Sequence, residues 1–302
     1  MPLRPARKAF RIFHHRRYFC RMTKLGQQIA IGYYRTKFKV LSAISNRKAA
    51  ELALDLFTTP QFRYKKPLPD IFKESEKLEF KHFGETVTGY RWNRGGHRKV
   101  LIVHGFNSSV AKFDHFIKPL MKKGYEVLAF DAPAHGYSTG KTLNAVVFKE
   151  MVEYIHKEYG PVRSYMGHSF GGLAICLALE EIEHTDDCHV VLIAPATESK
   201  TAIDIFFSFM KLNEGVRKEF DEYIYKLKDK PSEWYSVSRA VKNLKAKILW
   251  CHDEGDTITP WNDAKQVMDE KHYNIEFIIT KGLGHQKIYR DSKVSKAIIE
   301  FL

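Results

Sequence analysis

The feature that most constrains this chain is the alternation of short apolar runs with helix-length segments. Residues 99–105, KVLIVHG, hold an uninterrupted apolar run that ends near a glycine, which is typical of a strand buried on both faces. The same pattern recurs at 126–133, 164–169, 190–196, 247–254 and 275–280. Helix-length segments such as 143–158 and 170–183 separate these runs. The sequence therefore predicts an α/β fold with a mostly parallel central sheet and helices on both faces.

Two further segments complete the expected architecture. Residues 77–83 and 86–92 alternate between apolar and polar side chains, as an antiparallel strand pair does. Residues 197–245 separate two predicted strands by 49 positions and contain two amphipathic, helix-like stretches. Because sites in open α/β sheets lie beyond the carboxyl ends of the strands, we expect these residues to form a helical cap above the site. An ordinary pair of surface helices is the alternative.

The positive charge belongs to one end of the chain. The net charge of the whole chain is +14. Residues 1–66 hold 16 Lys and Arg and two acidic residues, a net charge of +14, so the positive and negative charges of residues 67–302 cancel. We therefore divide the chain into a basic N-terminal helical arm, 1–66, and an α/β domain, 67–302. Within the arm, 47–57 has helical periodicity and Pro60 would stop the helix. An even charge over the body argues against a nucleic-acid-binding protein.

Residues 4–24 of the arm interleave cations with aromatic and aliphatic side chains. Such a segment can lie on an anionic membrane surface, which we keep as a candidate partner. Solvated charges on an extension without a partner are the leading interpretation, and contact with nucleic-acid phosphates is the least favoured. The mean hydropathy is −0.36 and no apolar run reaches 18 residues, so we expect no membrane-spanning helix.

The spacing of the four cysteines matches neither a zinc site nor a CxxC motif. They are Cys20, Cys176, Cys188 and Cys251. Cys176 and Cys251 sit in apolar stretches, where a free thiol packs as a small hydrophobe. We expect a reducing compartment, and hence a cytoplasmic protein that can lie at the membrane periphery.

The strongest chemical motif is Gly167-His168-Ser169-Phe170-Gly171-Gly172. It follows a strand-like run and opens an apolar helix, which is the context that makes G-x-S-x-G a nucleophile elbow. Glycines on both sides allow close backbone approach in a strained turn, and the helix N-terminus favours a developing negative charge. Ser169 is the predicted nucleophile. A tight strand-to-helix turn in which Ser169 only caps the helix is the alternative.

A serine hydroxyl needs an adjacent base, and the base needs a partner that orients it. His285 follows the last predicted strand in a glycine-flanked loop, so it can reach the carboxyl edge of the sheet. Asp253 and Asp256 both follow the preceding strand. We favour Asp256, which lies further into the loop, and the order Ser…Asp…His is that of α/β hydrolases.

An oxyanion hole requires two backbone N–H donors. One is expected from Phe170, the residue after the nucleophile. The other is expected from the loop after residues 99–103, where we choose Phe106 with Asn107 as runner-up.

With these motifs the sequence resembles the α/β-hydrolase superfamily, in its esterase, lipase-like and serine aminopeptidase-like branch. The matching motifs lie within residues 77–302 and are 104–106, 131–138, 167–172, 256–260 and 284–285. Many relatives carry Arg-Gly or Pro-Gly where this chain has Pro133-Ala134, in a loop that is structural in the family. The resemblance implies that His104, His135 and His168 belong to the scaffold.

The motifs and the resemblance together imply hydrolysis of a carboxylic ester or thioester through an acyl-enzyme. The expected partner is a small-molecule acyl substrate, and the chemistry requires no metal and no organic cofactor. Amide, peptide or C–C bond hydrolysis on the same triad stays open, as does a non-catalytic binding protein of the same fold.

Overall fold

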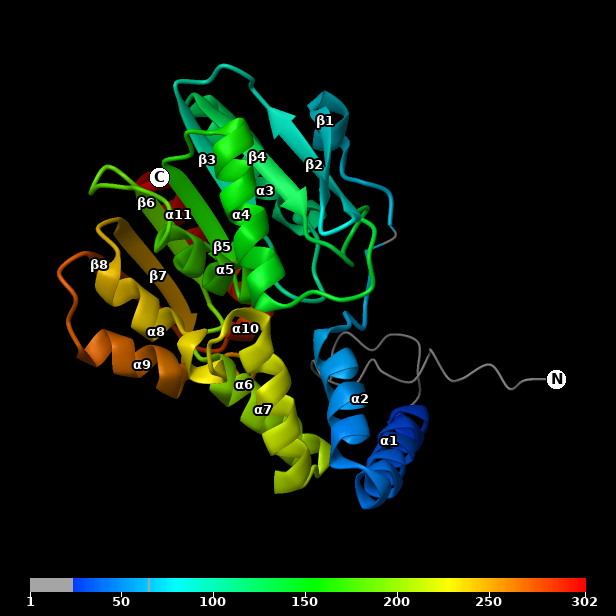
Figure 1. Cartoon of the computed structure of the whole chain (residues 1–302). Helices are drawn as coiled ribbons and strands as arrows, with labels where there is room; N and C mark the ends of the chain where they lie inside the picture. The colour runs from blue at the N-terminus through cyan, green and yellow to red at the C-terminus, as the bar shows by residue number, and fades with distance from the viewer. Residues whose placement is uncertain (1–23, 65) are drawn as a thin grey trace.

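The computed structural model describes residues 24–64 and 66–302 and contains one eight-stranded sheet in the order β1-β2-β4-β3-β5-β6-β7-β8 (Figure 1). The strands are β1 (Glu76–His82), β2 (Glu85–Trp92), β3 (Arg98–Val103), β4 (Tyr125–Asp131), β5 (Ser164–His168), β6 (His189–Ile193), β7 (Lys247–Asp253) and β8 (Ile275–Thr280). β2 pairs antiparallel with β1 and β4, and all other pairs are parallel. The predicted mostly parallel sheet is therefore confirmed.

Helices cover both faces of this sheet. The α-helices are α1 (Lys24–Ile44), α2 (Asn46–Thr58), α3 (Asp114–Lys122), α4 (Ala145–Tyr159), α5 (Phe170–Leu179), α6 (Ser199–Met210), α7 (Glu214–Lys228), α8 (Val237–Ala240), α9 (Trp261–Asp269), α10 (Gly284–Lys287) and α11 (Ser292–Phe301). Short 3-10 helices are η1 (Asp70–Glu74), η2 (Val110–Phe113), η3 (Ser232–Trp234), η4 (Val241–Asn243) and η5 (Ile288–Arg290). Apolar residues of α4, α5, α8 and α9 pack in one core and those of α3 and α11 in another, on the opposite face.

Burial along the strands follows their place in the sheet. Every residue of β4 and β5 is buried, as expected for strands with neighbours on both sides and helices on both faces. β8 was predicted by the same rule to be buried, and this is wrong, because all of its residues are partly or fully exposed. β8 pairs only with β7, so it forms the edge of the sheet.

Beyond one end of the sheet, α1, α2, α6 and α7 form a separate helical layer (Figure 1). α6 and α7 belong to the long segment between β6 and β7, whereas α1 and α2 come from the N-terminus. The Phe57 ring of α2 lies 5.3 Å from the Phe206 ring of α6 and 5.8 Å from the Phe220 ring of α7. Helices that are far apart in sequence thus share one apolar interior. We call these four helices the helical layer.

Residues 1–23, which hold almost all of the basic segment 4–24 together with Cys20, lie outside the described residues. In the described part of the chain, no helix is both long enough and apolar enough to cross a bilayer. Cys176, Cys188 and Cys251 are buried with free thiols.

Candidate active site

Ser169 lies in a strained turn between β5 and α5. Its φ of 55° and ψ of −121° place a non-glycine residue at positive φ, a conformation that costs energy and persists only where surroundings enforce it. The backbone supplies that enforcement. Ser169 N donates to Ile193 O at 3.0 Å, and Ala196 N donates to Ser169 O at 3.0 Å. The hydroxyl is thereby held at the carboxyl edge of the sheet.

Glycines around Ser169 permit contacts that no side chain would allow. A Cβ on Gly105 would lie 2.9 Å from the Ser169 Cβ. A Cβ on Gly171 would lie 2.4 Å from the carbonyl oxygen of Val103. The loop after β3 and the start of α5 therefore approach so closely that only glycine fits, as the G-x-S-x-G pattern predicts.

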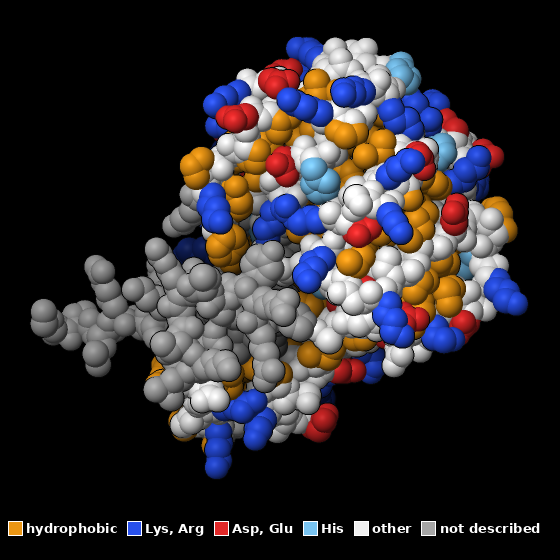
Figure 2. Space-filling view, turned by 180° about the vertical axis from the view of Figure 1, so that it is seen from behind, with side chains coloured by type: hydrophobic (Ala, Val, Ile, Leu, Met, Phe, Trp, Pro, Cys, Tyr) orange, Lys and Arg blue, Asp and Glu red, His pale blue; other side chains and the backbone are white. Residues whose placement is uncertain are grey.

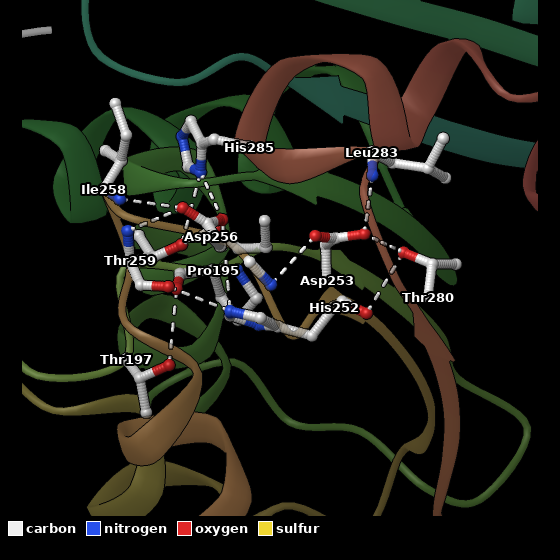
Figure 3. Close-up of polar contacts among 12 residues, drawn as sticks. Pro195, Thr197, His252, Asp253, Asp256, Ile258, Thr259, Thr280, Leu283 and His285 are labelled. Atoms are coloured by element: carbon white, nitrogen blue, oxygen red, sulfur yellow. Dashed lines mark hydrogen bonds and ion pairs between the residues drawn. The ribbon is translucent and has the colours of Figure 1, made fainter. Parts of the chain in front are cut away.

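Asp256 and His285 meet at the same edge of the sheet (Figure 3). His285 Nδ1 donates to Asp256 Oδ2 at 2.8 Å, and both side chains are buried. The other carboxylate oxygen accepts from the N–H groups of Ile258 at 2.8 Å and Thr259 at 3.1 Å. Burial acts to raise the pKa of Asp256, but the hydrogen bond and charge of His285, with the Ile258 N–H and the Thr259 hydroxyl, outweigh it and lower the pKa to about 2. Asp256 is thus an anion at neutral pH.

Asp253, the alternative partner, points away from His285 (Figure 3). Its carboxylate accepts from Gly255 N at 2.9 Å, Thr280 Oγ1 at 2.8 Å and Leu283 N at 2.9 Å. These bonds tie the turn after β7 to the loop after β8. Of the two aspartates, Asp256 is the one that contacts His285, whereas Asp253 stabilises the loops around it.

His168 connects His285 to the turn that holds Ser169. The two imidazole rings lie 4.6 Å apart, and His168 Nε2 donates to His285 O at 2.9 Å. Burial, followed by the charge of His285, lowers the pKa of His168 well below its ordinary value. His168 is therefore neutral and positions the loop after β8 through a backbone carbonyl. The residue beside Ser169 in sequence thus connects the nucleophile turn to the loop that carries His285.

The side chains of the two residues that are predicted to supply the oxyanion donors lie side by side. The rings of Phe106 and Phe170 are 5.8 Å apart, and within the described residues neither backbone N–H donates to another group of the chain. Asn107, the runner-up, differs because its N–H donates to His135 Nε2 at 3.3 Å. Its side-chain oxygen accepts from Gln61 N at 2.6 Å and Phe62 N at 3.0 Å. Asn107 thus joins the loop to the N-terminal segment, and its backbone N–H is already bonded to His135.

His104 and His135 are buried between the loops after β3 and β4. His104 Nδ1 donates to Gly105 O at 2.8 Å, while its Nε2 accepts from Ala132 N at 2.9 Å. Burial lowers the pKa of both imidazoles, so both are neutral. Each ring joins two loops and reaches no part of the cavity described next. Over residues 24–64 and 66–302, no cluster of His, Cys, Asp and Glu could hold a metal ion.

A cavity of about 360 Å³ opens at Ser169. Its lining includes Phe106, Asn107, Phe170 and Thr259 from the sheet edge, and Leu54, Phe57, Ile203, Phe206 and Ile224 from the helical layer. No Lys, Arg, Asp, Glu or His lines it among the described residues. The cavity wall is therefore apolar with a few neutral polar groups.

The phenylalanines of α6 differ in their surroundings. Of the three phenylalanines in the predicted cap, Phe206 lines the cavity, whereas Phe207 packs inside the helical layer and Phe209 lies beside Arg35. The contribution of α2 was missed. The periodicity of residues 47–57 indicated a helix but carried no signal for what its apolar face contacts.

The strained turn at Ser169, the Asp256–His285 pair and the mostly parallel sheet define an enzyme of the α/β-hydrolase class. The chain belongs to the serine aminopeptidase S33 family, whose model matches residues 96–247. No curated protein sequence matches the chain.

Solved structures with this fold include several hydrolases. Esterase Pf2001 of Pyrococcus furiosus is 23% identical, with a TM-score of 0.60 over 81% of this chain and 97% of its own. Est1E of Butyrivibrio proteoclasticus, solved with ferulic acid bound, is 18% identical, with a TM-score of 0.56 over 74% of this chain and 97% of its own. The thioesterase domain of the curacin biosynthetic pathway is 14% identical, with a TM-score of 0.55 over 75% of this chain and 99% of its own. At these identities the likeness demonstrates a shared fold.

Proposed function

We propose that this protein is a serine esterase or thioesterase that hydrolyses an uncharged acyl substrate through an acyl-enzyme. The observation that carries the proposal is the position of Ser169 in a cavity whose described lining holds no charged side chain. An apolar cavity with few polar groups suits an acyl chain, and its volume of about 360 Å³ lies within the range of small-molecule sites.

In this mechanism Ser169 Oγ attacks the carbonyl carbon, and His285 Nε2 accepts the hydroxyl proton. The Asp256 carboxylate holds His285 Nδ1–H and stabilises the imidazolium that forms. The N–H groups of Phe106 and Phe170 donate to the oxyanion. His285 returns the proton to the leaving alcohol or thiol as the acyl–oxygen or acyl–sulfur bond breaks. Water, deprotonated by His285, then attacks the carbonyl carbon of the acyl-enzyme. The bond from that carbon to Ser169 Oγ breaks, His285 returns the proton to Oγ, and the acid leaves.

Peptide hydrolysis is the main rival, because the family is described as serine aminopeptidases. An aminopeptidase must bind the α-ammonium group of its substrate, and a desolvated ammonium requires a carboxylate partner. None of the described residues that line the cavity is Asp or Glu. The proposal therefore favours esters and thioesters over peptides.

Labelling with a fluorophosphonate probe tests the proposal. The native protein is expected to label, and Ser169→Ala and His285→Ala are each expected to abolish labelling. Ser199→Ala is the matched control, since Ser199 lines the same cavity but begins α6. Turnover of p-nitrophenyl esters against aminoacyl-p-nitroanilides then separates the two activities. Faster release from the anilides would refute the esterase assignment, and a native protein that never labels would favour a binding protein.

We also propose that the protein works in the cytoplasm. The buried free thiols of Cys176, Cys188 and Cys251 support a reducing compartment. Fractionation of cells that express the full chain, with and without a salt wash, tests the location.

A further inference from the structure

One side of α1 is exposed and apolar. The exposed residues between 28 and 44 recur at helical spacing, and the large apolar ones among them are Ile29, Tyr33, Val40 and Ile44. Their separations of four, seven and four residues place them on one face of the helix. Ile29 is 64% exposed and Ile44 is 73% exposed. We call this set the α1 stripe.

The opposite side of α1 fixes the direction of the stripe. Ala30 and Phe38 are buried, and Tyr34 and Leu41 pack against the core. Arg35 donates to the carbonyl oxygen of Phe209 in α6 from Nε at 3.1 Å and from Nη2 at 2.6 Å. Because these contacts anchor α1 to the rest of the helical layer, the helix cannot rotate to bury its stripe without breaking them. Exposed apolar surface of this kind marks an interaction site.

The charges around the stripe favour an anionic partner. α1 carries Lys37 and Lys39, which lie in sequence between Tyr33 and Val40 of the stripe, and it contains no Asp or Glu. Indeed, the first acidic residue of the chain is Glu51. The body of the protein differs, since the charges of residues 67–302 balance and Figure 2 shows basic and acidic side chains interspersed on the face that it presents. An apolar stripe with lysines at its margins suits the headgroup region of a bilayer, where aliphatic side chains and Tyr enter the interface and lysines meet anionic lipids.

We propose that the α1 stripe docks the protein on the surface of an anionic membrane. α2, the next helix, contributes Leu54, Leu56, Phe57 and Thr58 to the cavity that opens at Ser169. Docking through α1 therefore holds this cavity close to the membrane surface. The surface assignment rests on α1 alone and stands whether or not Ser169 is the nucleophile.

Vesicle co-sedimentation of the full chain tests the proposal. The expected result is binding to vesicles of phosphatidylglycerol and phosphatidylcholine, and little binding to phosphatidylcholine alone. The triple variant Ile29→Ser, Val40→Ser, Ile44→Ser removes the three aliphatic side chains of the stripe, retains Tyr33 and leaves every charge in place. It is expected to lower partitioning by about tenfold or more, since each apolar side chain contributes to interfacial burial.

A matched control replaces exposed apolar side chains elsewhere. Phe83 is 61% exposed and Tyr273 is 93% exposed, and both lie far from α1 in the sequence. Phe83→Ser with Tyr273→Ser is expected to bind vesicles like the native protein. Circular dichroism and fluorophosphonate labelling of the triple variant establish that it is folded and report on Ser169 separately.

Three results would overturn the proposal. One is unchanged vesicle binding by the triple variant, which would assign the membrane contact to residues outside the stripe. Another is equal binding to neutral and anionic vesicles. The third is a native dimer that becomes monomeric in the triple variant without any vesicle binding, which would assign the stripe to a second copy of this chain.

Discussion

The site has two halves that are held together in different ways. One half lies at the carboxyl ends of the strands, here called the sheet edge, and the other is the helical layer. At the edge, Ser169, Asp256 and His285 are each held by hydrogen bonds, and around Ser169 the backbone also approaches so closely that side chains are excluded. In the helical layer, α2, α6 and α7 are held mainly by apolar contacts such as those of Phe57 with Phe206 and Phe220. Directional bonds tolerate few substitutions, whereas apolar packing tolerates many. The edge is therefore suited to chemistry and the layer to substrate selection.

The largest expected effect distinguishes the two aspartates of the sheet edge. Asp256→Asn removes the anion that orients His285 and stabilises its imidazolium, and is expected to lower kcat for a p-nitrophenyl ester by about 10⁴-fold. Asp253→Asn, three residues earlier, loses bonds to the 280–283 loop and should lower the unfolding temperature with a much smaller effect on kcat. Stopped-flow or steady-state kinetics of the two variants measures the difference. Equal losses in kcat would contradict the assignment of Asp256.

This pair also marks how far the sequence can be interpreted. Asp253 ends β7 and Asp256 lies three residues later, and no spacing rule decides which of them meets the histidine. The distinction arises from the turn at 256–259, which directs the Ile258 and Thr259 N–H groups to Asp256. The strands and the turn at Ser169 were predictable because their signals, the spacing of apolar residues and the glycines around Ser169, lie within the segments themselves. The place of α2 in the cavity wall was not, because it depends on contacts with α7, some 170 residues away.

The next prediction compares a glycine-to-alanine substitution at the sheet edge with the same substitution in the helical layer. In Gly171→Ala the new Cβ would lie 2.4 Å from Val103 O and 2.6 Å from His104 O, both backbone atoms that cannot move aside freely. We expect the free energy of unfolding to fall by about 3 kcal/mol, and esterase activity to fall with it. Urea denaturation monitored by circular dichroism measures the change.

Gly32→Ala is the matched substitution in the helical layer. Gly32 lies inside α1 with nothing within 4 Å of the added Cβ. Alanine there is expected to stabilise the helix by about 1 kcal/mol, because glycine loses more backbone entropy on folding. A loss of stability at Gly32 as large as that at Gly171 would remove the contrast between the regions.

Acid is expected to lower the free energy of unfolding through Asp256, which belongs to the sheet edge. The pKa of Asp256 is lowered to about 2, below the value of about 3.9 expected in the unfolded chain. A lowered carboxyl pKa stabilises the fold above the unfolded value, and this stabilisation is lost as the pH falls through the folded value. Asp256 is expected to contribute a few kcal/mol at neutral pH, lost between about pH 4 and pH 2. In Asp256→Asn the fall in urea stability over this interval should be smaller, and an identical fall would argue against the shift.

The last comparison concerns substrate selection by the helical layer. Phe57→Ala enlarges the cavity where α2 meets α6, so the ratio of kcat/KM for long against short acyl esters is expected to rise about tenfold. Phe207→Leu is the control, because Phe207 packs beside Phe206 and Phe220 without lining the cavity. If both variants changed the ratio equally, the effect would reflect loosened packing of the layer. A change in Phe57→Ala alone would assign acyl-chain selection to a helix that the N-terminal segment contributes.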